Sequence, residues 1–243
     1  MGIQFGIKDL DHLIGKEGIP ENAITEIYGE STSGLSTLAL QACAAAVKAG
    51  KTAIFFDGTQ MADLYRIEEL GATGTNVFDV QELESAVAAI KQLIGHVDLI
   101  VVNAVNCMMP KAWMACDLGN ADPCSYDKIL SVAMPEIRKR LEGSNTSLII
   151  VNHKRHTSIR PLKQAMDTGD YGYQPRQEYF LFWSVTRLGM FKYGEDHAQI
   201  VVAKNNRAPT QAKTCVLKRT LSGFTASKKK PYQAKESSDV TGV

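Results

Sequence analysis

The 243-residue sequence contains no apolar run that approaches the ~20 residues needed by a membrane-spanning helix. Its N-terminus, MGIQFGIKDLDHLIG, has neither a basic stretch nor a continuous apolar stretch, so we expect no secretory signal. Cysteine is scarce: the five cysteines are odd in number and form no C-x-x-C pair. This usage is typical of the reducing cytosol rather than of a disulfide framework. We therefore expect a cytoplasmic protein that has no membrane partner.

Acidic residues are scarce only in the second part of the chain. The net charge of +1 combines residues 1–150, with 11 basic and 19 acidic residues, and residues 151–243, with 16 basic and 7 acidic residues. From Lys204 to Lys235 there are nine basic residues and no acidic one. This asymmetry favours a polyanionic partner for the C-terminal part. The alternative is a basic tail that is only solvated.

The apolar content of 44% and the length suit one globular core. Short apolar runs alternate with longer amphipathic ones. The apolar runs predict strands at 23–29, 52–57, 76–80, 98–103 and 147–152. The amphipathic runs predict helices at 36–50, 61–71, 82–95 and 126–141. This alternation is typical of an α/β fold, in which helices cover both faces of a mostly parallel, twisted sheet.

The pattern changes after Asn152. Residues 153–178 form a long polar stretch with glycine and proline, which indicates a functional or mobile loop. Three stretches rich in β-forming residues follow, at 179–189, 198–205 and 212–221, and they predict an antiparallel β extension. From residue 225 the sequence is rich in serine and lysine. We therefore expect a core domain over 1–224 and a basic, disordered tail over 225–243.

The stretch GESTSGLST, from Gly29 to Thr37, has the spacing of a phosphate-binding loop, G-x-x-x-x-G-K-[ST], but it has Leu35 in place of the lysine. A predicted strand precedes it and a predicted helix follows it, which is the arrangement that such a loop requires. Backbone N–H groups of the loop and the helix N-terminus can bind an anion without the lysine.

Several further motifs match one family in the same order along the chain. They are IPENAITEIYGESTSGLSTLALQ, GKTAIFFDG, VDLIVVNAV, MPKAWMACDLG, SLIIVNHKR and VVAKNNRAP. Over residues 5–224 the chain resembles the RecA family of recombination ATPases, and ITEIYGE is also similar to the archaeal and eukaryotic branch. The resemblance implies a RecA-like P-loop NTPase core and a function in DNA recombination and repair.

The chain departs from the family at four positions of the catalytic site. Leu35 replaces the lysine that contacts the β- and γ-phosphates, and Asn103 replaces the aspartate that helps to hold Mg²⁺. Thr59 replaces the catalytic glutamate, and His153 replaces the glutamine that senses the γ-phosphate. Phosphoryl transfer depends almost entirely on positioning and on the stabilisation of charge by cations and metal ions. We therefore predict that no catalytic residue remains and that ATP hydrolysis is inefficient.

Nucleotide binding without hydrolysis is a separate expectation. The resemblance implies contacts to ATP or ADP with Mg²⁺ from Gly29, Ser31, Thr32, Ser33, Gly34, Ser36, Thr37 and Asp63. Among them, Asp63 matches an adenine-contacting acid of the family, and Arg66 stands at the position of a stacking tyrosine. The alternative is that the loop only connects a strand to a helix, with Leu35 where the phosphates would lie. The histidines and cysteines have no spacing typical of zinc, so we predict no further metal site.

The resemblance also implies positions for DNA and for a neighbouring subunit. The segment after Asn152 matches a DNA-binding loop of the family. Its four cations suit the phosphates of single-stranded DNA: Lys154, Arg155, Arg160 and Lys163. A solvated surface loop is the alternative. Lys204 matches the first of two lysines that reach a neighbouring subunit, and Arg207 lies next to the second, which predicts a former subunit interface.

Three functions stay open. We favour an accessory factor without ATP hydrolysis that binds single-stranded DNA, a RecA-type recombinase or a repair polymerase. The first alternative is an active DNA-dependent ATPase with strand-exchange activity, and the second is a structural or assembly protein. The segments that the family has before and after the core are not matched, so we expect self-association without long filaments.

Overall fold

The computed structural model describes residues 2–15, 18–116, 125–153, 177–207 and 214–232. One nine-stranded sheet has the order β3-β2-β4-β5-β1-β6-β7-β8-β9. The parallel part consists of β1 (Ala23–Gly29), β2 (Ala53–Asp57), β3 (Asn76–Asp79), β4 (Leu99–Asn103), β5 (Ser147–His153) and β6 (Thr186–Lys192). Three antiparallel strands continue the sheet from β6: β7 (His197–Asn205), β8 (Thr214–Thr220) and β9 (Gly223–Ala226).

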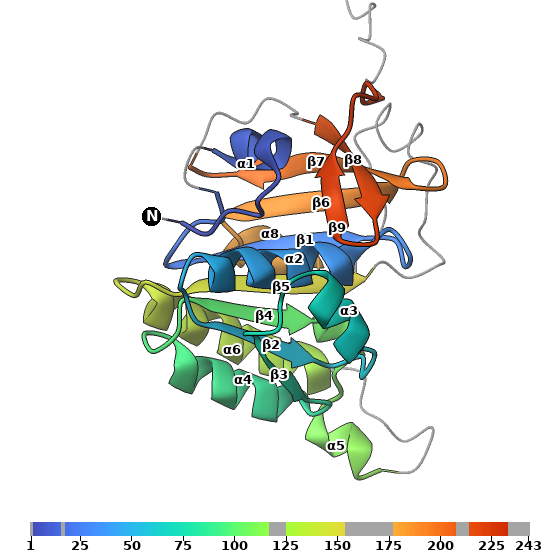
Figure 1. The fold of residues 1–243 in the computed structure, drawn as a ribbon. Coiled ribbons are helices and arrows are strands. Elements are labelled where there is room, and N and C mark those ends of the chain that lie inside the picture. The colour runs from blue at the N-terminus through green and yellow to red at the C-terminus, as the bar shows by residue number, and fades with distance from the viewer. Residues whose placement is uncertain (1, 16–17, 117–124, 154–176, 208–213, 233–243) are drawn as a thin grey trace, which may run out of the picture.

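Helices cover both faces of this sheet (Figure 1). They are α1 (Lys8–Ile14), α2 (Leu35–Lys48), α3 (Leu64–Glu69), α4 (Leu83–Leu93), α5 (Lys111–Met114), α6 (Ser125–Leu141) and α8 (Gln177–Trp183), with a short 3₁₀ turn η1 (Val105–Cys107). Among the described residues, none of these helices combines the length and apolarity that crossing a membrane requires.

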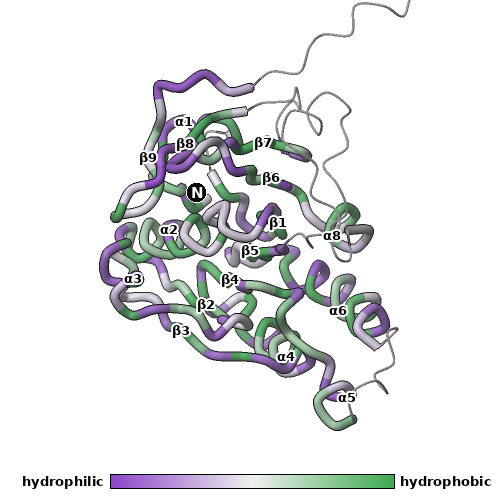
Figure 2. The backbone as a smooth tube through the Cα atoms, turned by 90° about the vertical axis from the view of Figure 1, so that its right-hand side faces the viewer, coloured by the Kyte–Doolittle hydropathy of each residue, from purple (hydrophilic) through white to green (hydrophobic). Residues whose placement is uncertain are grey.

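Alternating side chains of the strands divide the core in two. In β5, Ile149 and Val151 join the cluster under α1, α2 and α3, whereas Leu148 and Ile150 join the cluster under α4, α6 and α8. Figure 2 shows the matching hydropathy, with hydrophobic residues along the central strands and a hydrophilic segment after β9. The predicted α/β fold with an antiparallel C-terminal extension is confirmed.

The strand predicted at 179–189 is wrong in its first half. Its first half belongs to the helix α8, and only its second half enters β6. Phe180 is buried between the sheet and α6, while the next residue, Leu181, and Phe182 are exposed. Because an apolar aromatic run of this length fits a helix as well as a strand, periodicity alone could not separate the two.

The segment after β8 is held against the sheet beyond the predicted domain boundary at residue 224. β9 ends at Ala226. The side chain of Gln199 on β7 then donates to the carbonyl of Tyr232 (3.0 Å) and accepts from its N–H (2.9 Å). Gln199 is fully buried, so these two bonds satisfy an amide that would otherwise be costly inside the protein. The boundary itself stays a prediction.

Two of the cysteines are buried deeply enough to predict their reactivity. Burial raises the pKa of Cys43 and of Cys215 from 9.0 to about 12, which lowers the thiolate fraction near neutral pH about 1000-fold. We expect iodoacetamide to modify the exposed Cys107 of the native protein at about pH 8, while both buried thiols react at least ~100-fold more slowly. Peptide mass spectrometry measures this, and denaturation in urea should remove the difference. Rapid labelling of Cys43 in the native protein would contradict the packing of α2.

Candidate functional site

The phosphate loop (Gly29–Thr37) connects β1 to α2 at the carboxyl edge of the parallel strands. In the strand register, Gly29 lies beside His153 and Asp57 lies beside Asn103. The sheet therefore brings Asn103 and His153, two of the four positions at which the sequence departs from the family, to strand ends next to the loop. Thr59 follows two residues after Asp57, and it lies within the same hydrogen-bond network as that aspartate.

The loop glycines are required by close contacts. Gly34 has a φ of 100°, which favours glycine, and a Cβ at this position would lie 2.5 Å from the ring of Phe224. A Cβ at Gly29 would collide with the carbonyl oxygen of Met190 on β6. The loop conformation is therefore fixed by its packing against β6 and the β8–β9 hairpin (Thr214–Ala226).

Leu35 is 2% exposed and belongs to the apolar core under α2. A lysine at this position of a phosphate loop carries its charge to the ligand, whereas Leu35 contributes apolar packing. The loop itself therefore provides backbone donors and hydroxyl groups but no cation. No side chain among the described residues caps the N-terminus of α2, and its first turn has no acid. An anion there would meet the positive end of the helix.

Ser36 and Asn103 form a hydrogen bond with each other across the site. The Ser36 hydroxyl donates to Asn103 Oδ1 over 2.9 Å, and Asn103 is 3% exposed. Mg²⁺ prefers carboxylate and water oxygens in octahedral geometry. Asn103 brings no negative charge, and its side-chain oxygen already accepts from Ser36. In the part of the chain that the structure describes, no group of three or more His, Cys, Asp or Glu residues could hold a metal ion. This donor set does not fit magnesium.

The buried carboxylate of Asp57 is occupied by the turn that follows it. Asp57 Oδ1 accepts from the Thr59 N–H (2.9 Å) and the Thr59 hydroxyl (2.6 Å), and Oδ2 accepts from the Ala62 N–H (2.7 Å). Thr59, which the resemblance aligns with the family's catalytic base, is therefore a hydrogen-bond donor to Asp57. A hydroxyl in this state has no capacity to take a proton from water.

His153 ends β5 and is joined to the turn after β4. Asn106 Nδ2 donates to the His153 carbonyl, and the His153 N–H donates to Asn106 Oδ1, each over 3.1 Å. Burial lowers the pKa of His153, so the imidazole is neutral at neutral pH. These two bonds between the Asn106 side chain and the His153 backbone couple the ends of two neighbouring strands, a contact for which the sequence carries no signal.

The β8–β9 hairpin packs against the phosphate loop, α2 and α3 (Figure 1). Gln41 donates to the Phe224 carbonyl (2.9 Å) and accepts from the Phe224 N–H (2.8 Å). Arg219 Nη2 donates to the Thr32 carbonyl of the loop over 2.6 Å. Sequence reasoning missed these contacts, because the hairpin follows the loop by more than 180 residues and no motif links them.

Asp63, the predicted adenine contact, and the nearby Arg66 both have partners within the chain. Asp63 caps α3, since its Oδ1 accepts from the Tyr65 N–H over 3.0 Å. Arg66 forms an ion pair with Glu69 (3.1 Å) and donates to the carbonyl of Leu221 at the hairpin turn. Arg66, where the resemblance implies a stacking tyrosine, therefore connects α3 to the hairpin.

The two predicted interface residues also have partners in their own chain. Lys204 Nζ donates to the carbonyls of Leu181 (2.7 Å) and Phe182 (3.3 Å) in the last turn of α8. Burial, and then the charge of Arg187, lower the pKa of Lys204. Arg207 Nη2 donates to the Glu21 carbonyl over 3.0 Å. Their role at an interface stays a prediction.

The predicted DNA-binding cations lie outside the described residues: Lys154, Arg155, Arg160 and Lys163. His153, the residue before them, ends β5 at the same edge of the sheet as the phosphate loop. Their contact with DNA stays a prediction.

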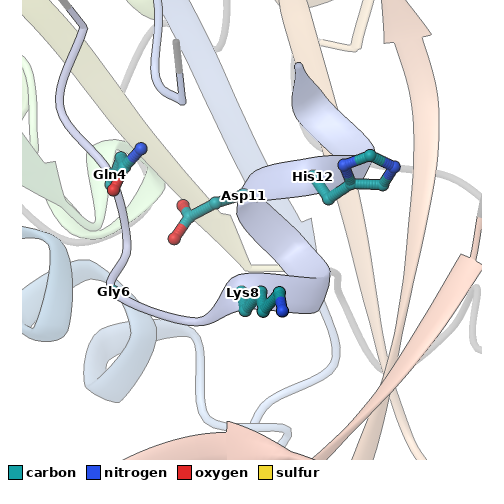
Figure 3. A pocket seen from close by; sticks show the side chains of 5 residues that line it. All are labelled: Gln4, Gly6, Lys8, Asp11 and His12. Carbon is teal, nitrogen blue, oxygen red and sulfur yellow. The ribbon is translucent and has the colours of Figure 1, made fainter. Parts of the chain in front are cut away.

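A hollow of about 370 Å³ lies on the N-terminal segment (Figure 3). It is lined by Gln4, Gly6, Lys8, Asp11 and His12. Asp11 accepts from the N–H groups of Phe5 (2.7 Å) and Ile7 (3.0 Å), while burial raises its pKa. The Asp11 carboxylate therefore holds the turn before α1 and is not available to a ligand.

The chain is similar to a known protein family and to several curated proteins. The family described as RecA N-terminal domain matches residues 2–216. Protein RecA from Aquifex pyrophilus and Protein RecA from Aquifex aeolicus (strain VF5) are each 32% identical over 220 residues, which cover 85% of this chain and 62% of the relative. Protein RecA from Desulfotalea psychrophila is 32% identical over 217 residues and is covered to 60%. The chain spans about three fifths of the length of these relatives.

Proposed function

Because the chain belongs to the RecA family, we propose that it is a factor of DNA recombination and repair that does not hydrolyse ATP efficiently. One observation carries this proposal: Leu35, Thr59 and Asn103, which the resemblance aligns with the family's cation, base and metal carboxylate, are each engaged inside the protein. Charge neutralisation, metal anchoring and water activation are thus weakened together. The proposed partners are single-stranded DNA and a recombinase or repair polymerase.

Binding of ATP or ADP without turnover is part of the proposal. The uncapped N-terminus of α2 supports it, because the first N–H groups of a helix bind phosphate well. A nucleotide held in this way would control the protein by being bound or released, and not by being hydrolysed. The backbone N–H groups of the loop would bind the phosphates. The hydrogen bonds of Asn106 and Asp57 would keep the ends of the neighbouring strands in place around it.

An active DNA-dependent ATPase is the competing function, and one observation favours it. Arg219 places a cation next to the phosphate loop although the loop lysine is absent. Measured ATP turnover decides between the two functions. Failure to bind any nucleic acid, together with stable self-association, would instead favour an assembly role.

Binding of single-stranded DNA is expected to depend steeply on salt. If all four cations between Lys154 and Lys163 contact phosphates, the slope of log K against log salt is about −3, and a fourfold rise in salt weakens binding about 50-fold. Fluorescence anisotropy with a labelled single-stranded oligonucleotide, with and without Mg-ATP, measures this slope. A variant with alanine at all four positions, Lys154, Arg155, Arg160 and Lys163, should lose most of this salt dependence.

A matched control removes four cations at the opposite edge of the sheet. The last turns of α2, α4 and α6 carry them: Lys48, Lys91, Lys139 and Arg140. Alanine at these positions changes the net charge equally and should leave affinity within about twofold, because non-contacting charges are screened. Equal losses from both variants would contradict a DNA site after β5. An effect of ATP on the wild type would support control by bound nucleotide.

A further inference from the structure

We infer that Arg219 replaces the missing loop lysine as the phosphate-binding cation, and that the site holds the phosphates of a nucleoside di- or triphosphate without magnesium. This inference rests on the nucleotide binding proposed above for the same loop. It names the residue that recognises the ligand and the metal requirement of the site.

The position of Arg219 is fixed from β8. Its Nη2 donates to the Thr32 carbonyl over 2.6 Å and would lie 3.4 Å from a Cβ at Gly34. The guanidinium carbon lies 5.8 Å from the centre of the Phe224 ring. Phe224 is 1% exposed, and Gln41 holds its backbone with two hydrogen bonds. The cation therefore reaches the loop on a rigid support.

Arg219 retains donors that have no acceptor. A guanidinium has five N–H groups, and the contact with Thr32 uses one Nη2 donor. Across the described residues, Arg219 forms no ion pair, and its Nε is buried without a hydrogen-bond partner. The buried Nε is out of reach of a ligand, so the donors that can meet a phosphate are the remaining Nη N–H groups of this half-buried side chain. Guanidinium groups bind phosphate oxygens in a bidentate manner.

The remaining polar groups explain why magnesium is not required. Ser36 donates to Asn103, whose amide has no charge to offer a metal ion. Asp57 is fully buried and accepts three hydrogen bonds from Thr59 and Ala62. A divalent ion would meet no available carboxylate in this set, whereas the Arg219 charge offsets the charge of a phosphate directly. Affinity should thus depend on the arginine rather than on the metal.

The experiment measures binding of ADP and ATP to the full chain by calorimetry, once with MgCl₂ and once with EDTA. We expect the wild-type Kd for each nucleotide to differ by no more than about threefold between these conditions. Arg219→Ala should weaken binding by about 10-fold or more, because a charge-assisted bidentate contact is lost. Arg219→Lys keeps the charge but not the planar fork, so an intermediate loss is expected.

Lys218→Ala is the matched control. Lys218 is the preceding residue of β8, is exposed, and lies on the other side of the strand from Arg219, so the substitution removes the same charge from the opposite face. It should leave the Kd within about twofold, since exposed surface charges contribute little. Urea unfolding of each variant shows whether the fold is retained.

The outcomes separate this inference from the proposed function. Absence of nucleotide binding by the wild type, with or without metal, overturns both the inference and the nucleotide part of the proposal. Wild-type binding that Arg219→Ala leaves unchanged overturns the inference alone. Tighter binding by Arg219→Ala would show instead that the hairpin blocks the loop. Loss of wild-type binding in EDTA would overturn the magnesium-free site.

Discussion

ATP turnover by this protein, with single-stranded DNA and magnesium present, is expected to be at least about 1000-fold slower than that of a family member that retains the lysine, aspartate and glutamate. This factor corresponds to about 4 kcal/mol of lost transition-state stabilisation, which is modest for three altered groups. Leu35 is buried, Asn103 is bonded to Ser36, and Thr59 is bonded to Asp57. Release of phosphate under saturating ATP measures the rate.

Ser36→Ala distinguishes residual turnover by this chain from a contaminating ATPase. The variant removes the hydroxyl that faces Asn103 and should lower any genuine turnover, while a contaminant is unaffected. Turnover within about tenfold of the competent relative, sensitive to Ser36→Ala, would reject the non-hydrolysing function in favour of a divergent ATPase.

Arg187→Met is expected to destabilise the fold by about 3–5 kcal/mol, because it leaves the carboxylate of Glu26 buried without its cation. Glu26 on β1 is fully buried and accepts from Arg187 Nε on β6 and from Asn152 Nδ2 (3.1 Å) on β5. The Arg187 guanidinium also lies 4.9 Å from the centre of the Tyr28 ring. Glu26 thus links β1 to both neighbouring strands, and urea unfolding measures the loss of its contact with Arg187.

The sign of the pH dependence follows from burial. Burial raises the pKa of Glu26 above 4.5, whereas Arg187 opposes this rise, so the pKa should rise further in Arg187→Met. A carboxyl group whose pKa is higher in the folded than in the unfolded state stabilises the fold at low pH. This contribution to the free energy of unfolding is lost as the pH rises through the folded-state pKa. The deficit of the variant should therefore grow from about pH 5 to about pH 8.

Lys192→Met serves as the control on the same strand. Lys192 is exposed at the end of β6, and its loss should change the free energy of unfolding by less than about 0.5 kcal/mol at either pH. Equal changes in the free energy of unfolding for Arg187→Met and Lys192→Met would show that the contact between Glu26 and Arg187 does not stabilise the fold. Replacing Glu26 and Arg187 together by apolar residues should recover most of the stability.

The sequence predicted those parts of the molecule that depend on local patterns. The apolar run at 23–29 became β1 with the predicted ends, and the strand ends brought Asn103 and His153 to the loop because parallel strands share an edge. The run around Phe180 was misassigned, since its helix depends on packing against α6. Local pattern carries no information on such packing.

The parts of the site that the sequence could not predict are contacts between distant segments. Arg219 appeared only as one of several basic residues, and its place on the phosphate loop depends on a contact across 187 residues. The bond between Ser36 and Asn103 likewise spans 67 residues, so the motif could show the substitution but not its new partner. Side-chain partners at the site follow from the assembled sheet rather than from the motif.

The strand order also determines when the site can form during synthesis. β1 lies between β5 and β6, so the strand that carries the phosphate loop has no sheet neighbour until more than 110 further residues have left the ribosome. β8, which brings Arg219, is made later still. Chains that are still growing thus expose an unpaired and mostly apolar strand of seven residues, which is the kind of state that chaperones protect from aggregation.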